Sequence, residues 1–183
     1  MQAVERLSRQ TGRGPGIATV RERERLRSSS SSLHGLRIVV GQFGGLSTLT
    51  RALARDLRLR GALVISADEP DAIAQADAAN HFGADLYVGF ETRSDGANRI
   101  CYYAVPTFES TGGRSLAERL VAGLGKLPGG EACLAGMRLQ VLRETRMPAV
   151  LASFGSVRHT TDHSLEVAQI VRVAIEAWAI QPL

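Results

Sequence analysis

The segment Gly83-Ala84-Asp85-Leu86-Tyr87-Val88-Gly89-Phe90 is the most informative stretch of the sequence for the architecture. Its second half is an apolar run with the length of a buried β-strand. The Ala-rich segment before it, Asp71–His81, is typical of a helix, and Gly83 is the kind of residue that commonly ends one. A helix that leads directly into a buried strand predicts a sheet whose strands are joined through covering helices.

The same alternation extends from this segment in both directions. Toward the N-terminus it predicts strands over Leu36–Val40 and Ala62–Ser66, with a helix between them that begins at Ser47-Thr48 and ends at Gly61. Toward the C-terminus it predicts strands over Arg99–Val105, Arg138–Leu142 and Ala149–Ala152, and helices over Ser115–Leu124 and Asp162–Trp178. This order predicts an α/β protein: a single three-layer domain with a mixed, mostly parallel sheet covered by helices.

The carboxyl ends of parallel strands are where ligands of such sheets gather. In this sequence those ends are Gly41–Gly45, Phe90–Arg93 and Ser153–His159. We therefore expect binding or catalytic residues in these three segments.

Motifs at the same three ends resemble those of one enzyme family. They are Val40-Gly41-Gln42-Phe43-Gly44-Gly45, then Ala79-Asn80 followed by Gly83-Ala84-Asp85-Leu86-Tyr87-Val88, and Met147-Pro148-Ala149-Val150-Leu151-Ala152-Ser153-Phe154-Gly155. In order and flanking pattern they resemble the Asp-Pro-Gly-His-Gly-Gly, Ala-Asn…Ala-Asp-Leu-Phe-Val-Ser-Ile-His and Met-Pro-Ala-Val-Leu-Val-Glu-X-Gly motifs of zinc-dependent N-acetylmuramoyl-L-alanine amidases of type 3. The resemblance covers residues 36–183 and implies the amidase fold.

The resemblance assigns chemical roles from which this sequence departs. The family's first zinc-binding His falls on Phe43, its second on Glu91, and its catalytic Glu on Ser153. The loop that carries the family's ligand Glu is missing, because Gly45 runs directly into Leu46. A phenyl ring has no lone pair, a single carboxylate does not make a zinc site, and a Ser hydroxyl is not a base near neutral pH. The sequence therefore predicts no metal ligands and no cofactor.

Hydrolysis by the family's route is not expected from such a site. Losing general acid–base help alone costs about 10²–10⁴-fold in rate, and losing the metal also removes the activation of water. We interpret the chain as a catalytically degenerate amidase-like domain that acts as a binding or regulatory module in peptidoglycan metabolism. The alternative is an active zinc amidase that hydrolyses the bond between N-acetylmuramic acid and L-alanine.

The candidate binding residues are the charged or titratable side chains at the strand ends: Glu91, Arg93, Arg158 and His159. The simplest expectation is that Glu91, Arg93 and Arg158 form ion pairs where the resemblance places the metal. The Gly41–Gly45 segment could also cradle a phosphate, but it lacks the Gly-Lys-Ser/Thr of a Walker motif.

Two further chemistries remain open after the last strand. His159, Asp162 and His163 have the spacing of one helical face and could hold a metal, but the same segment is also typical of a polar helix N-terminus with solvated histidines. Ser153 could be a nucleophile with His159 or His81, although no Gly-x-Ser-x-Gly elbow surrounds it.

Composition separates a basic segment from the rest of the chain. Residues 1–35 are expected to form a basic, Ser-rich tail or linker, with Ser28–Ser32 as a low-complexity run and a short helix over Ala18–Leu26. Seven Arg and three Glu lie in residues 1–36, whereas the remaining charges balance. Nucleic acid is therefore not an expected partner of the folded part.

The remaining composition is that of a soluble globular protein, with 44% hydrophobic and 22% charged residues. No apolar run approaches the length of about 20 residues that crosses a bilayer, and no signal peptide is recognisable, so a cytoplasmic protein or a fragment of a longer one is expected. Cys101 and Cys133 are too few for a disulfide framework, and we expect both to be buried.

Two more segments, Glu22–Ser29 and Leu142–Pro148, are similar to segments of CwlM-type actinobacterial regulators. In those proteins peptidoglycan-binding repeats precede an amidase-like domain. That resemblance implies peptidoglycan fragments or a cell-wall biosynthesis protein as partners.

Overall fold

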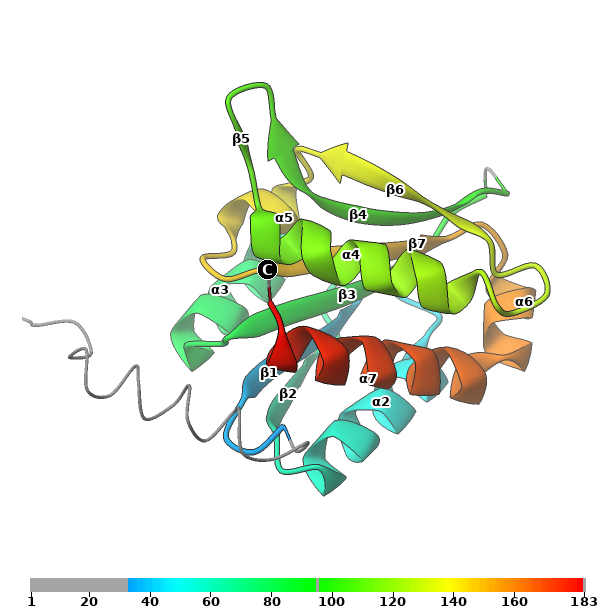
Figure 1. Cartoon of the computed structure of the whole chain (residues 1–183), viewed down its shortest axis with the longest axis horizontal. Helices are drawn as coiled ribbons and strands as arrows, with labels where there is room; N and C mark the ends of the chain where they lie inside the picture. Colours follow the sequence, from blue (N-terminus) through cyan, green and yellow to red (C-terminus); the bar gives the residue numbers. More distant parts are fainter. Residues whose placement is uncertain (1–32, 95, 183) are drawn as a thin grey trace, which may run out of the picture.

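A seven-stranded sheet lies between two layers of helices in the computed structural model, which describes residues 33–94 and 96–182 (Figure 1). Its strands are β1 (Arg37–Gln42), β2 (Leu63–Ala67), β3 (Leu86–Thr92), β4 (Asn98–Val105), β5 (Phe108–Glu109), β6 (Ala132–Met137) and β7 (Ala149–Phe154). Its helices are α2 (Ser47–Leu59), α3 (Ala72–Phe82), α4 (Thr111–Leu124), α5 (Gln140–Glu144), α6 (Val157–Asp162) and α7 (Ser164–Ile180).

The sheet is mixed and mostly parallel, as predicted. The strand order is β2-β1-β3-β7-β4-β5, with β6 on β4. Strands β2, β1, β3 and β7 are parallel to one another, β4 runs antiparallel to β7, and β6 is parallel to β4. The carboxyl ends of β1, β3 and β7 therefore lie side by side at one edge of the sheet.

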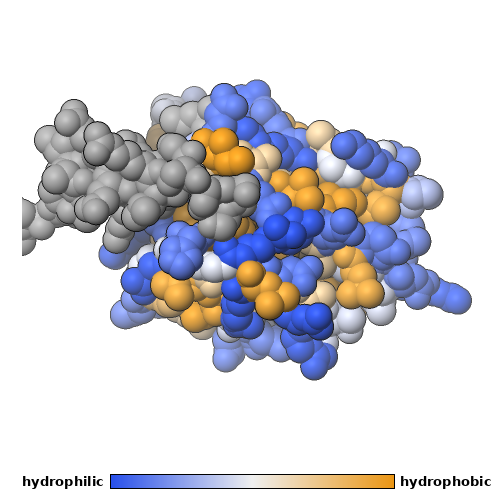
Figure 2. All heavy atoms as spheres, turned by 60° about the horizontal axis from the view of Figure 1, so that its bottom comes forward, coloured by the Kyte–Doolittle hydropathy of each residue, from blue (hydrophilic) through white to orange (hydrophobic). Residues whose placement is uncertain are grey.

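The two faces of the sheet bury different cores. One face packs on α2, α4 and α7 through a large apolar cluster, and the other packs on α3 and α5 through a smaller one. On the outer surface of α2 and α7, apolar side chains alternate with polar ones (Figure 2). Among the described residues no helix is long and apolar enough to cross a membrane.

Helix α3 and strand β3 form as predicted, on either side of Gly83. Asp71 caps the helix by accepting a hydrogen bond from Ile73 N at 2.8 Å, and Gly83 ends it with a φ of +63°. Asp85 then fixes β3 against β1, because Asp85 Oδ2 accepts from Arg37 N and Asp85 N donates to Arg37 O.

The folded part begins earlier than residue 36. The side chain of Leu33 is 3% exposed and belongs to the larger core. Leu36 N donates to Leu33 O, and Gly35 N donates to Gly61 O, both at 3.0 Å. The rest of the expected tail, including the helix expected over Ala18–Leu26, lies outside the described residues.

The strand predicted over Arg138–Leu142 is wrong. Gln140–Glu144 form helix α5, whose Val141 and Leu142 are both buried against the α3 face. The strand is the preceding segment, Ala132–Met137, whose small residues have weak strand preference and which forms β6 by pairing with β4. Pairing between distant segments overrode local preference here.

Two helix boundaries and one helix cap also differ from the prediction. Helix α4 begins at Thr111 with Ser110 as its cap, and α6 and α7 replace one helix over 162–178. The expected cap by Ser47-Thr48 is absent, because Leu46 is the cap position and makes no side-chain cap bond. Gln42 supplies an acceptor instead, since its Oε1 accepts from Leu46 N at 2.9 Å.

Candidate functional site

The parallel register brings Phe43, Glu91 and Ser153 together at one edge of the sheet. Phe43 N donates to Phe90 O at 2.9 Å, which holds the residue after β1 beside the end of β3. Glu91 and Ser153 are register partners on β3 and β7. The Ser153 hydroxyl donates to Glu91 Oε1 at 2.7 Å.

These three side chains share the sheet face covered by α3 and α5. Side chains alternate along a strand, and the neighbours Phe90, Ala152 and Phe154 enter the core on the opposite face. The Phe43 ring is partly buried against the smaller core. Phe43, at the position that the resemblance assigns to a zinc ligand, thus contributes apolar packing instead.

A buried polar pair lies beneath the site. Tyr87 Oη donates to Gln75 Oε1 at 2.7 Å, and Gln75 Nε2 donates to Gln42 O at 2.7 Å and to Glu69 O at 2.5 Å. Gln75 is fully buried, so these bonds satisfy a polar group that would otherwise destabilise the fold. Burial, and then the charge of Glu91, raise the pKa of Tyr87 far above its usual value, so its hydroxyl stays protonated.

Gly41 leaves the space that this pair needs. A Cβ at Gly41 would overlap Gln75 Oε1 and lie 2.5 Å from Tyr87 Oη. A glycine is therefore required at this position, because the side chains of Gln75 and Tyr87 approach its backbone closely. The sequence pattern identified Gly41 only as the end of a strand, and its contact with Gln75 and Tyr87 could not be read from local sequence.

One arginine lies near the carboxylate, and a second lies on the far side of Ser153 in the sheet. Arg93 Nη1 lies 3.9 Å from Glu91 Oε1, so the expected pair between these two residues is present, although Arg93 is 46% and Glu91 25% exposed. Arg99 lies opposite Ser153 in the β4–β7 register. Arg99 could not be placed here from local sequence, because its neighbour is set by an antiparallel pairing between distant strands.

Cys101 is the thiol nearest this charge cluster. Burial raises its pKa to about 11, with a further increase from the charge of Glu91 and an opposing effect of Arg99. The thiol is therefore protonated near neutral pH and is a poor nucleophile. Cys133, which we expected to be buried, is exposed because β6 is a marginal strand of the sheet.

The candidates that follow β7 lie apart from Glu91. Arg158 belongs to the exposed helix α6, and its ionic partner in the described part of the chain is Asp162, at 3.9 Å. The expected pair between Arg158 and Glu91 is therefore wrong. The ring of His159 faces the turn at Gly129, where a Cβ would lie 3.2 Å from it.

The interpretation of the segment around His159 and Asp162 as a helix N-terminus is also wrong. The cap is Ser156, whose Oγ accepts from His159 N at 3.2 Å, and residues 160–162 lie inside α6. The His159 and His163 rings are 4.6 Å apart and partly buried rather than fully solvated.

The donor set does not fit a catalytic zinc ion. Within residues 33–94 and 96–182, no three His, Cys, Asp or Glu side chains are close enough to hold one metal. At the assigned ligand positions Phe43 offers no donor, and Glu91 already accepts the Ser153 hydroxyl. The loop assigned to the third ligand is absent, because α2 begins two residues after Gly45.

The remaining sequence-based chemistries have no supporting geometry. The Ser153 hydroxyl donates to Glu91 rather than to a histidine, and His81 bonds to Asp77 O on its own helix. In the Gly41–Gly45 segment the Phe43 amide bonds to Phe90 O, so it is not directed at an anion.

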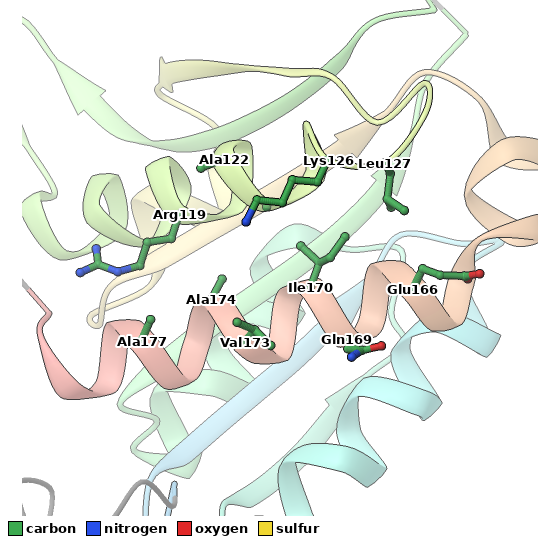
Figure 3. A pocket seen from close by; sticks show the side chains of 11 residues that line it. Arg119, Ala122, Lys126, Leu127, Glu166, Gln169, Ile170, Val173, Ala174 and Ala177 are labelled. Atoms are coloured by element: carbon green, nitrogen blue, oxygen red, sulfur yellow. The ribbon is translucent and has the colours of Figure 1, made fainter.

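Two hollows differ in their relation to the site. One, of about 590 Å³, opens at the same edge of the sheet and is lined by Thr92, Arg93, Ser94, Gly155 and Val157. The other, of about 470 Å³, is an apolar groove between α4 and α7 with Arg119 and Lys126 at its rim (Figure 3). It lies on the face opposite Glu91, so only the first hollow belongs to the site.

Comparison with solved structures places this arrangement among known folds. AmiC2 of Nostoc punctiforme, an N-acetylmuramoyl-L-alanine amidase, superposes with a TM-score of 0.63 at 15% identity, over 79% of this chain and 98% of that one. The fold is that of the N-acetylmuramoyl-L-alanine amidases. The catalytic domain of the amidase CwlV from Paenibacillus polymyxa (TM-score 0.60, 16% identity, 78% and 98% covered) and Ami1 from Mycobacterium abscessus (0.61, 15%, 79% and 99%) agree with this assignment.

The likeness to these amidases is structural. No family model matches the sequence. No curated protein matches it either. Identities of 15–16% at nearly complete coverage of the amidase domains show a shared fold, and function has to be argued from the site itself.

Proposed function

We propose that this chain is an amidase-fold module that binds peptidoglycan fragments, or regulates a cell-wall biosynthesis protein, without hydrolysing peptidoglycan. The observation that carries the proposal is the hydrogen bond from Ser153 to Glu91. It occupies the place where the resemblance puts a zinc ligand and the catalytic base. The Glu91 carboxylate accepts a hydrogen bond from a hydroxyl and lies beside the guanidinium of Arg93. This arrangement suits stabilisation of the fold and recognition of a charged ligand.

The charges at the edge support binding of anionic groups. The peptide stems of peptidoglycan fragments carry carboxylates, and a guanidinium pairs with a carboxylate through two parallel hydrogen bonds. Arg93 lines the hollow at this edge and is 46% exposed. We therefore propose Arg93 as the main contact for a peptide carboxylate, with Glu91 orienting it, and Arg158 and His159 at the rim beyond Val157.

The proposal is tested by titrating purified muropeptides into the protein and following both binding and cleavage by calorimetry and mass spectrometry. We expect saturable binding with no new products. Arg93→Ala should weaken binding by roughly tenfold, as expected for the loss of a charged hydrogen bond. Arg55→Ala, which removes an exposed arginine on α2, is the matched control and should bind normally. Cleaved products in the same samples would instead favour an active amidase, and absence of binding to any muropeptide would exclude these fragments as ligands.

A second variant examines the lost chemistry directly. The triple variant combines Phe43→His, Glu91→His and Ser153→Glu, which restores the two imidazoles and the base that the resemblance assigns. The third ligand remains missing, because Leu46 separates Gly45 from the first residue of α2 and leaves no loop to carry it. Two imidazoles hold a metal weakly and fix its orientation poorly.

A further inference from the structure

The groove between α4 and α7 has an apolar floor that the described chain leaves partly open to solvent. It encloses about 470 Å³, and Figure 3 shows α4 along one side and α7 along the other. Ile170 and Val173 contribute to the floor, and Val173 is 49% exposed. The α7 residues that line the groove run from 166 to 177, about three helical turns. The groove therefore has the length of a short helix.

The packing of α4 on α7 creates this groove. A Cβ at Gly123 would lie 2.6 Å from Ile170 Cγ2, so the two helices are in close contact there. Ala122, Ala174 and Ala177 also line the groove, and their short side chains leave space above the contact. The shape of the groove is thus fixed by the helix pair itself.

Two cations lie on the α4 side of the groove without a carboxylate beside them. Arg119 lies within α4, where its Nη2 donates to Gln181 O at 2.9 Å, and Lys126 is exposed in the turn that follows the helix. Within the described residues neither side chain forms an ion pair. Seven residues separate them, which corresponds to about 10 Å along a helix axis. An occupant with two negative charges at that spacing would match this side of the groove.

We propose that the groove binds an acidic amphipathic helix of another protein. Apolar side chains of that helix, spaced i, i+3 or i+4, and i+7, pack on Ile170 and Val173. Two acidic residues seven positions apart on its α4-facing flank lie beside Arg119 and Lys126. Glu166 on the α7 side of the groove accommodates a basic residue on the other flank.

Other occupants match these charges less well. A fatty acyl chain brings one anionic head group, whereas the groove has two separated cations, and the chain would stay partly in water. A second copy of this chain offers no suitable helix within the described residues, because α7 has two acidic residues, Glu166 and Glu176, ten positions apart, and each other helix has at most one. Residues 1–32, with seven Arg and three Glu, have the wrong net charge.

The test measures binding of two synthetic helical peptides to the full chain by fluorescence anisotropy at low salt. Both peptides carry Leu at i, i+3, i+4 and i+7, with Glu at two flanking positions seven apart in one and Lys at those positions in the other. We expect saturable binding of the acidic peptide and at least roughly tenfold weaker binding of the Lys peptide. Equal affinities, or no binding of the acidic peptide, would overturn the proposal.

Variants of the chain locate the contact. Lys126→Glu should weaken binding of the acidic peptide by roughly tenfold, and replacing the facing Glu of the peptide by Lys should restore it. Val173→Glu places a carboxylate on the apolar floor and should abolish binding of both peptides. Arg55→Glu, at an exposed position of α2 outside the groove, is the matched control. Circular dichroism checks that each variant is folded.

The same variants keep this proposal separate from the proposed function. The groove shares no lining residue with the hollow beside Arg93, so Lys126→Glu and Val173→Glu should not change binding of muropeptides. Palmitate serves as the probe for an acyl chain. Palmitate binding that Val173→Glu abolishes, without binding of the acidic peptide, would identify a lipid as the occupant, and the proposal would be wrong. Peptide binding that neither groove variant changes would contradict it equally.

Discussion

The hydrogen bond between Ser153 and Glu91 should contribute measurably to folding. Ser153→Ala removes the hydroxyl that donates to Glu91 Oε1 at 2.7 Å. Ser153 is 1% exposed, so water does not easily replace the lost donor. A hydrogen bond to a charged group contributes about 1.5–3 kcal/mol. Because Glu91 is 25% exposed and keeps Arg93 as a neighbour, the lower value applies, about 1.5 kcal/mol.

Urea unfolding at neutral pH, followed by circular dichroism, measures this loss. The expected change corresponds to a decrease in Tm of about 3–6 °C for a chain of this size. The variants Ser153→Ala and Glu91→Ala and their double variant form a cycle whose coupling energy should be about 1 kcal/mol. Ser66→Ala, at an exposed serine on β2, should leave stability unchanged. Strictly additive effects, or a Ser153→Ala protein as stable as the original, would refute the pairing.

Three further outcomes follow from the site. Gly41→Ala should destabilise the protein by about 2 kcal/mol in denaturant unfolding, because its methyl group overlaps the buried Gln75–Tyr87 pair; a neutral effect would mean that this pair can shift. Alkylation followed by mass spectrometry should label Cys133 in the folded protein and Cys101 only after unfolding, since burial raises the pKa of Cys101 to about 11; equal labelling rates would contradict its burial. The triple variant should bind zinc more tightly than the original chain yet release no muropeptides, and full activity would reveal an unrecognised third ligand.

The parts of the fold that local sequence determines were predictable. The apolar run in β3 and the glycine at +63° that precedes it are local features, and they placed α3 and β3 correctly. The alternation of strands and helices also predicts that Phe43, Glu91 and Ser153 lie at one end of the parallel strands, and the strand register agrees. The hydrophobic periodicity and the order of the elements are enough to predict this, because the carboxyl ends of parallel strands lie at the same end of the sheet.

The parts that depend on contacts between distant segments were not predictable. Ala132–Met137 is a strand because β4 pairs with it, while the Arg138–Leu142 segment, in which polar and apolar residues mix, overlaps helix α5. Arg99 joins the site through its antiparallel register with Ser153. Arg158 carries a charge of suitable sign but points along α6 to Asp162. In each case the structure depends on contacts between segments distant in the sequence, and these cannot be read from a local stretch of sequence.

The proposed function requires that this chain does not hydrolyse peptidoglycan. The most direct measurement is the release of peptides from purified peptidoglycan by the full chain, with zinc added and with a chelator. Because Phe43 offers no metal donor and Ser153 no base, we predict no release above the protein-free control in either condition. Zinc-dependent release that grows with protein concentration and disappears with the chelator would contradict the account.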